Sequence, residues 1–213
     1  MILMTWKDVD PAKVHRLFYP QVPLVVTVEH TRRIGAMPAI WCMPSSFNPP
    51  LIGVSVAPEH ETYKMILEAQ AFAINWLEYS YAEQVGELGE TSGREYVNKL
   101  STVGLTTIKG SKTSQPLIQE ASAALECRLR ERVRTGMHEL IVGEVAGAYA
   151  SENFGEYWDF SKYDPLFYAG TTSERVKSWV FMSCRGTVKR TPSSIKPRQA
   201  TRSTTHPDLA LLH

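Results

Sequence analysis

The stretch AIWCMPSSFNPPLIGVSVA at residues 39–57 places two apolar segments of strand length on either side of a polar corner. Two consecutive prolines, Pro49 and Pro50, end that corner. Proline fixes its own backbone torsion and has no N–H donor, so it interrupts a strand and favours a turn. The stretch therefore predicts strands over residues 36–43 and 51–57, joined by a stiff Ser-Ser-Phe-Asn corner on which a ligand could sit.

On both sides of this stretch, the sequence predicts several short strands and few helices. Residues 123–132 alternate apolar and charged side chains, which predicts a strand with one buried and one solvated face. Gly136 marks a hairpin turn before a partner strand over residues 138–145. The other expected elements are strands over 22–28 and 71–76, a turn over 29–35, a helix after Thr62, helices over 81–88 and 94–100, and an aromatic strand or turn over 163–168. The pattern indicates a mainly β fold with α elaborations, of the antiparallel barrel type.

The composition is that of an ordinary globular protein. The chain has 213 residues, of which 43% are hydrophobic and 21% charged, with a formal net charge of +1. The longest apolar runs are of strand length, far below the roughly 20 residues of a membrane helix. We therefore expect no membrane span. The first residues lack a basic leader, so we expect a cytoplasmic protein.

The charge divides the chain into two regions. From residue 185 onward there are six Lys and Arg residues against one acid, Asp208, which gives +5, whereas residues 1–184 carry −4. The later region is rich in Ser, Thr and Pro and has few apolar groups. We predict a folded domain over residues 1–184 and an extended basic tail over 185–213. Its spread charges favour a linker or a subunit-clasping arm over a nucleic-acid contact.

Several common chemistries have no support in the sequence. The three cysteines form no CxxC pair, and the six histidines form no HExxH motif, which argues against a disulfide framework and a zinc site. The glycines of residues 86–93 do not fit GxGxxG, and GxxxxGK[ST] and GxSxG are missing. Cys42 and His138 could form a thiol nucleophile and its base, but a cysteine in an apolar strand is more often a small core residue.

The quoted corner has the groups that a planar, phosphorylated cofactor such as FMN requires. Backbone groups of residues 39–42 could bond the edge of the ring, and hydroxyl groups could reach the phosphate. A helix beginning near residue 60 would add amides that favour an anion. The candidate cofactor-binding residues are Ala39, Ile40, Trp41, Cys42, Ser45, Ser46, His60 and Thr62. The alternatives are an ordinary turn at Ser45 and Ser46 and a core position for Trp41.

A longer run, from Trp41 to Tyr63, resembles the flavin reductase-like, FMN-binding split-barrel family, which includes flavoredoxin. Further matches occur in order over residues 17–170: Leu17–Pro20, Pro23–Thr27, Phe72–Asn75, Ser92-Gly93, Gly104–Thr106, Leu125–Cys127, Gly136–His138, Val142–Val145 and Pro165–Tyr168. The resemblance implies a six-stranded split barrel of antiparallel Greek-key type. It also implies a homodimer with FMN near the subunit interface, and hydride transfer from NADH or NADPH to the flavin.

The sequence departs from the family pattern at several positions. Gly35, Pro38 and Ile40 stand where the family has polar side chains, and His60 replaces a phosphate-binding Arg. Imidazole is charged only part of the time at neutral pH, whereas guanidinium always is, so we expect looser FMN binding. His138 matches the family's Gly-Asp-His turn and is the candidate catalytic residue, in contact with the nicotinamide or the flavin edge. The alternative for His138 is a surface turn.

Three functions remain open on the sequence. The first is an NAD(P)H-dependent flavin reductase that supplies reduced FMN. The second is an FMN-bearing electron carrier that takes electrons from a protein donor and has no nicotinamide site. The third is a barrel that has lost its flavin and acts as a binding module through its basic tail.

Overall fold

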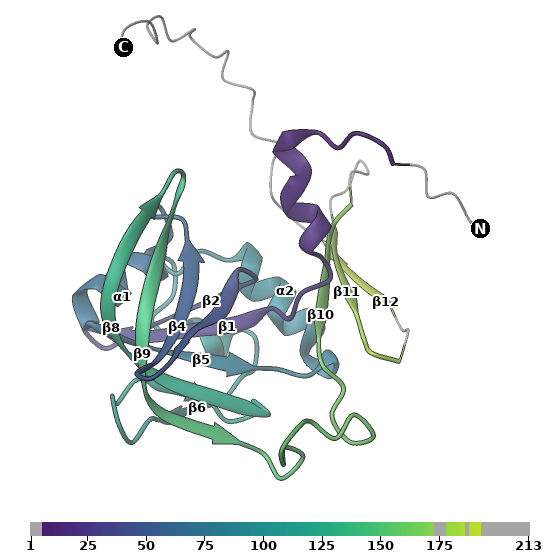
Figure 1. Cartoon of the computed structure of the whole chain (residues 1–213). Coiled ribbons are helices and arrows are strands. Elements are labelled where there is room, and N and C mark those ends of the chain that lie inside the picture. The colour runs from purple at the N-terminus through teal and green to yellow at the C-terminus, as the bar shows by residue number, and fades with distance from the viewer. Residues whose placement is uncertain (1–5, 173–177, 186–187, 193–213) are drawn as a thin grey trace, which may run out of the picture.

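A seven-stranded antiparallel sheet dominates the fold of this chain (Figure 1). The structure is a computed structural model that describes residues 6–172, 178–185 and 188–192. The strand order is β2-β1-β5-β8-β9-β4-β3, and β2 and β3 form the two edges, so the barrel is not closed. The seven strands are β1 Leu24–His30, β2 Arg33–Ala39, β3 Cys42–Phe47, β4 Pro50–Val56, β5 Ala71–Trp76, β8 Ala123–Thr135 and β9 His138–Ala150. The mainly β antiparallel fold is confirmed, with seven strands in place of the expected six.

The remaining elements cover the sheet or extend it. The two smaller sheets consist of β6 Thr107–Lys109 with β7 Pro116–Ile118, and of β10 Phe167–Thr171, β11 Ser178–Met182 and β12 Val188–Pro192. The helical elements are η1 Pro11–Phe18, α1 Glu61–Ala69, η2 Tyr79–Tyr81, α2 Ala82–Glu90 and α3 Lys99–Thr102. Figure 1 shows α2 between the main sheet and the three-stranded sheet. The 3-10 helix η1 stands apart, beside β10.

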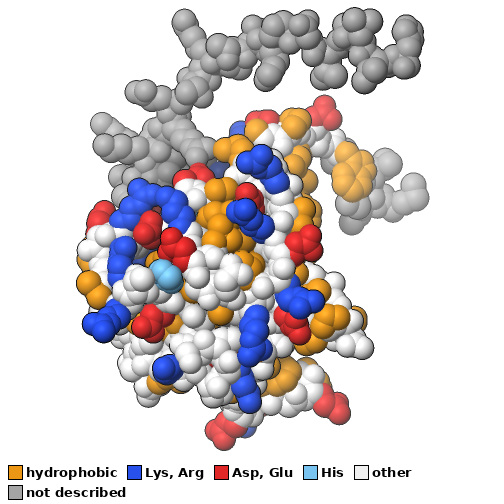
Figure 2. Space-filling model, turned by 90° about the vertical axis from the view of Figure 1, so that its left-hand side faces the viewer, with side chains coloured by type: hydrophobic (Ala, Val, Ile, Leu, Met, Phe, Trp, Pro, Cys, Tyr) orange, Lys and Arg blue, Asp and Glu red, His pale blue; other side chains and the backbone are white. Residues whose placement is uncertain are grey.

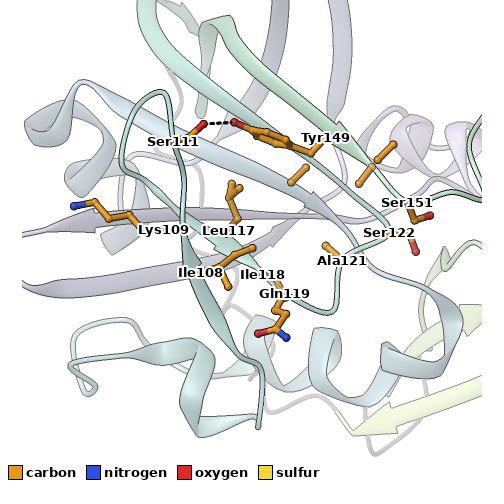
Figure 3. A pocket seen from close by; sticks show the side chains of 13 residues that line it. Ile108, Lys109, Ser111, Leu117, Ile118, Gln119, Ala121, Ser122, Tyr149 and Ser151 are labelled. Atoms are coloured by element: carbon orange, nitrogen blue, oxygen red, sulfur yellow. Dashed lines mark hydrogen bonds between the residues drawn. The ribbon is translucent and has the colours of Figure 1, made fainter.

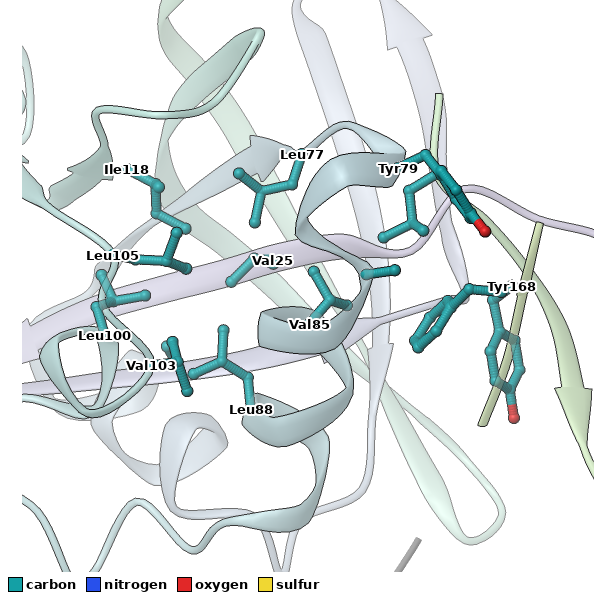
Figure 4. Packing of buried hydrophobic residues seen from close by; sticks show 14 residues of the cluster. Val25, Leu77, Tyr79, Val85, Leu88, Leu100, Val103, Leu105, Ile118 and Tyr168 are labelled. Atoms are coloured by element: carbon teal, nitrogen blue, oxygen red, sulfur yellow. The ribbon is translucent and has the colours of Figure 1, made fainter. Parts of the chain in front are cut away.

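β1 is the strand on which the two cores meet. Its first five residues are all buried, because side chains that alternate along a strand here meet apolar material on both faces. Val25 belongs to the cluster under α2, which also contains Leu77, Val85 and Leu88 (Figure 4). Val26 belongs to the other cluster, which fills the barrel below α1.

The quoted stretch folds differently from the prediction in the position of its bend and in the length of its corner. The expected strand over residues 36–43 is two strands, because the chain bends at Ile40 and Trp41 between β2 and β3. Ser45 and Ser46 lie within β3, where a register shift occurs between Pro44 and Ser46. The tip between β3 and β4 is shorter than expected, because Phe47 already pairs with Pro50. Two prolines, Pro38 and Pro44, lie in the two edge strands, where a missing N–H is tolerated.

Two other elements also differ from the expectations. The turn expected over 29–35 is confined to Thr31 and Arg32, both with positive φ, because Arg33 already pairs with His30. The prediction of a helix over 94–100 is wrong. Helix α3 begins only at Lys99, since the Asn98 side chain accepts hydrogen bonds from the amides of residues 100 and 101 and so fixes the start.

The alternation in β8 holds from Cys127 to Arg130, but Ala124 and Glu126 on the opposite face are both buried. Cys127 is fully buried, as expected. Glu126, expected on the solvated face, is also 0% exposed, because the segment before β7 covers it. Its carboxylate accepts hydrogen bonds from the amides of Lys112 and Thr113, the Thr113 hydroxyl and the Tyr149 hydroxyl.

The predicted boundary at residue 184 falls inside the hairpin between β11 and β12. β12 pairs with β11 from Val188 to Pro192, so regular structure continues past that boundary. The rest of the predicted tail, 193–213, lies outside the described residues. Among the residues that the structure describes, no helix combines the length and the apolar character needed to cross a membrane. The cytoplasmic location stays a prediction.

Candidate functional site

The bend between β2 and β3 forms one wall of a cavity of ≈ 200 Å³. Five of the predicted site residues meet there: Ala39, Ile40, Trp41, His60 and His138. The other lining residues are Tyr19, Met37, Pro38, Ser55, Val56 and Ala57. Thus β2, β4, the start of α1 and the start of β9 converge on one place, although they are far apart in the sequence.

Trp41 is held at the centre of this site by both its backbone and its ring. Its carbonyl oxygen accepts a 2.9 Å hydrogen bond from the amide of Ser55, which fixes the bend against β4. The centroid of its ring lies 5.0 Å from that of His138 and 6.0 Å from that of His15 in η1. The indole is partly exposed, at 38%, so it forms a wall that a planar ligand can reach.

His138 is positioned by the turn that precedes it. Its carbonyl oxygen accepts a 2.9 Å hydrogen bond from the Thr135 hydroxyl. The next residue, Glu139, accepts a 2.5 Å hydrogen bond from the buried Tyr63 hydroxyl of α1. These contacts tie the start of β9 to α1 and therefore keep His138 near Trp41.

His60 is the N-cap residue of α1, but its side chain makes no capping hydrogen bond to the helix. Burial lowers the pKa of its imidazole, and the nearby positive charges of Lys99 and His138 lower it further, against an opposing effect of Glu59. His60 is thus mostly neutral at pH 7. This supports the expectation that it binds phosphate more weakly than an Arg would.

The backbone at the bend fits the requirements of a flavin ring. The outer edge of β2 is bridged to Asn98 at Ile34, but nearer the bend it pairs with no described strand, so N–H and C=O groups there are directed away from the sheet. Met37, Pro38 and Ile40 provide an apolar wall beside that edge. An isoalloxazine ring needs this combination of backbone hydrogen bonds and apolar contact.

The other four predicted residues lie outside this cavity. Cys42 lines two neighbouring cavities, and burial raises the pKa of its thiol to about 12, which does not support a thiolate nucleophile. Ser45 and Ser46 lie in β3 toward its hairpin tip. Thr62 is buried in the first turn of α1. Their roles in phosphate binding stay predictions.

The structure also reveals charged residues that sequence reasoning missed. Arg33 and Arg94 both contact Glu61 at the start of α1, with N–O distances of 3.5 and 3.1 Å. Lys99 is 4% exposed, donates a 2.7 Å hydrogen bond to the carbonyl oxygen of Leu88, and has a pKa lowered to about 8 by burial. These residues are dispersed along the chain, so no motif signals their proximity.

A second cavity, of ≈ 380 Å³, is remote from this site (Figure 3). It lies between β6, β7 and the far ends of β8 and β9, and none of its lining residues belongs to the cavity at Trp41. Ser111 and Tyr149 share a 2.9 Å hydrogen bond at its rim. No group of His, Cys, Asp or Glu side chains suited to a metal ion occurs among the described residues.

Comparison with known proteins agrees with the geometry of this site. The family model described as "Flavin reductase like domain" matches residues 15–176. The chain belongs to this family. The family resemblance stated from the sequence over residues 17–170 is thereby confirmed.

Three similar proteins illustrate the range of the family. An uncharacterized protein of Aeropyrum pernix is 38% identical over 179 residues, which cover 83% of this chain and 68% of that protein. An NADH-dependent FAD reductase of Streptomyces globisporus is 28% identical over 141 residues, which cover 65% of this chain and 76% of that protein. The crystal structure of an FMN-binding protein from Thermus thermophilus with bound 1-cyclohex-2-enone superimposes with a TM-score of 0.66 at 26% identity. The match covers 92% of this chain and 100% of that one. The split-barrel fold is therefore confirmed.

Proposed function

We propose that this protein binds FMN at the cavity beside Trp41 and is an NAD(P)H-dependent flavin reductase. The observation that carries the proposal is the convergence of Trp41, His60 and His138 on the bend between β2 and β3 in a chain of the flavin reductase family. The similarity to an NADH-dependent reductase supports the nicotinamide half of the proposal.

The proposed roles follow from the positions of the side chains. Bound FMN would supply an acceptor for the hydride of a stacked nicotinamide. The backbone of residues 39–42 would hold the edge of the ring, and Trp41 would pack against it. His60 and the start of α1 would face the phosphate, with Ser45, Ser46 and Thr62 as further donors.

His138 is proposed to contact the nicotinamide or the flavin edge. Its ring lies beside Trp41, and its backbone is held by the turn at Thr135. Orientation of the two rings and exclusion of water are the main contributions of such a residue, because hydride transfer needs no obligatory general acid.

We also propose a homodimer. Apolar side chains protrude at the tips of two hairpins, with Phe47 99% exposed at the end of β3 and Met137 69% exposed between β8 and β9. Such side chains are typical of interface residues. A protein that accepts electrons from the reduced flavin is a further proposed partner.

The first experiment is an FMN titration of the purified protein, followed by fluorescence quenching. Saturable binding that weakens at least fivefold in Trp41→Ala and in Ser46→Ala, with little change in Ser111→Ala at the remote cavity, is expected. NADH or NADPH should then bleach the flavin absorbance without oxygen. Binding without bleaching would favour the electron carrier, and failure to bind FMN would refute the flavoprotein proposal.

A further inference from the structure

The 3-10 helix η1 has an unusual apolar surface. None of its eight residues is buried. Its apolar side chains Val14, Leu17 and Phe18 are 47%, 68% and 69% exposed. The helix is held at its end, where Gln21 and Tyr168 exchange backbone hydrogen bonds of 3.1 and 2.7 Å and the Tyr19 ring packs 5.1 Å from the Tyr168 ring. Its position is therefore fixed by β10, while part of its apolar surface lines an open cavity.

That cavity has a volume of ≈ 390 Å³ and adjoins the proposed flavin site, with which it shares Trp41 and Ser55. It is lined by Val14, His15, Phe18, Gln21, Trp41, Cys42, Met43, Ser55 and Leu140. No Lys, Arg, Asp or Glu is among these described lining residues. Mostly apolar and aromatic walls with a few polar groups, at this volume, are typical of small-molecule sites.

The two cavities are neighbours. Trp41 and Ser55 line both of them, and the centroid of the Trp41 ring lies 6.0 Å from that of His15 in the larger cavity and 5.0 Å from that of His138 in the smaller one. A ligand in the larger cavity would therefore lie next to a ring bound in the smaller one. On the face drawn in Figure 2, a group of hydrophobic side chains is bordered by both basic and acidic side chains.

We propose that the cavity between η1 and Trp41 binds a planar, uncharged aromatic electron acceptor of the quinone class. The aromatic side chains of Phe18, His15 and Trp41 offer stacking surfaces, and the lack of charged lining residues favours a neutral ring over a nucleotide. Gln21, Ser55 and His15 provide a small number of polar groups for the ring oxygens. This inference rests on the proposed function, because the flavin site would deliver the electrons.

The overall reaction balances without a further reactant. NAD(P)H gives up a hydride, which carries two electrons and one proton, and solvent supplies the second proton. The quinone gains two electrons and two protons and becomes a hydroquinone, while NAD(P)H becomes NAD(P)⁺. The flavin returns to its starting oxidation state.

Binding of 2-methyl-1,4-naphthoquinone, measured by tryptophan fluorescence without flavin or nicotinamide, tests the site independently of the proposed function. The full-length protein should bind it saturably. Phe18→Ala should weaken binding at least fivefold, and Val14→Trp, which fills the cavity, should abolish it. Leu17→Ala is the matched control, because Leu17 is as exposed as Phe18 on the same helix but does not line the cavity. Trp41→Phe should reduce the amplitude of the quenching.

The outcomes separate this inference from the proposed function. Quinone binding that follows this order of variants supports the site even if NAD(P)H fails to reduce a bound flavin. Equal weakening in Phe18→Ala and Leu17→Ala, or no saturable binding, would overturn it. Dissociation of a dimer by both variants in analytical ultracentrifugation, with quinone binding absent, would instead assign this face to a second copy of the chain and would also overturn it.

Discussion

Two regions of the molecule differ in the solvent exposure of their side chains. At Glu126, a charged group on a strand is fully enclosed and accepts hydrogen bonds from both backbone and side-chain donors. Around Trp41 and η1, apolar side chains remain open to solvent beside two adjoining cavities. The first region is stabilised by contacts within the chain, whereas the second has the features of a ligand-binding surface.

The largest expected effect lies in the enclosed region. Burial acts to raise the pKa of Glu126, but the hydrogen bonds from Tyr149, Thr113 and Lys112 outweigh it and keep that pKa below its usual value. Glu126→Ala should therefore cost about 3 kcal/mol or more of unfolding free energy, because several donors lose a charged acceptor that is fully buried. Urea unfolding measures this. Glu144→Ala, which removes a partly exposed ion pair with Arg130, is the control and should cost less than about 1 kcal/mol. Equal losses would contradict the comparison.

A second effect concerns the buried Lys99 beside α2. Its folded-state pKa of about 8 lies below the value of about 10.4 in an unfolded chain, so the unfolded state binds more protons between these values. This group therefore makes the folded state less stable at pH 8, and that cost is relieved as the pH rises. Between pH 8 and 10 its contribution should change by about 2 kcal/mol in favour of folding.

Tyrosines also titrate near pH 10. Unfolding of Lys99→Met at the same pH values therefore separates the contribution of Lys99 from that of the tyrosines. The difference in unfolding free energy between the normal chain and Lys99→Met should shift by that amount across the interval. A difference that stays constant from pH 8 to 10 would show that Lys99 does not titrate as its burial implies.

A smaller effect is expected at the open region, in the pH dependence of FMN binding. The lowered pKa of His60 means that the imidazole gains its charge only below pH 6.5. FMN affinity relative to that of His60→Gln should rise a few-fold as the pH falls from 7.5 to 5.5. The affinity is divided by that of His60→Gln because the phosphate of FMN itself loses charge near pH 6 in both proteins. A constant ratio would place the phosphate away from His60.

The smallest expected effect is the stability of the η1 variants. Phe18→Ala and Leu17→Ala should each change the unfolding free energy by no more than about 0.5 kcal/mol, because both side chains are exposed. Thermal unfolding of the two variants without ligand measures this. A large loss for either would mean that η1 contributes to the fold, and the contrast with Glu126 would fail.

The sequence predicted the strands well where local pattern decides them, as at 71–76 and 138–145. It failed where a distant contact decides the outcome. Glu126 is buried because the segment before β7 closes over it, and residues 94–97 are not helical because Ile34 bonds to the carbonyl oxygen of Val97. Neither contact can be read from a local period.

The same distinction applies to the candidate site. Ala39, Ile40 and Trp41 are consecutive, and the corner that identified them is a local feature. His60 was placed with them by the predicted start of a helix and His138 by the family resemblance, and the structure brings all five together. Arg33, Arg94 and Lys99 were not found, because their proximity to the start of α1 depends on how β2 and α3 are arranged around it.

The prolines of the two edge strands have a consequence for the behaviour of the chain at high concentration. An unclosed barrel offers two strand edges on which a further copy could add its own strand and begin templated growth. Pro38 on one edge and Pro44 on the other each remove a donor that such an added strand would need. Both prolines therefore act against the addition of a further strand to the open barrel.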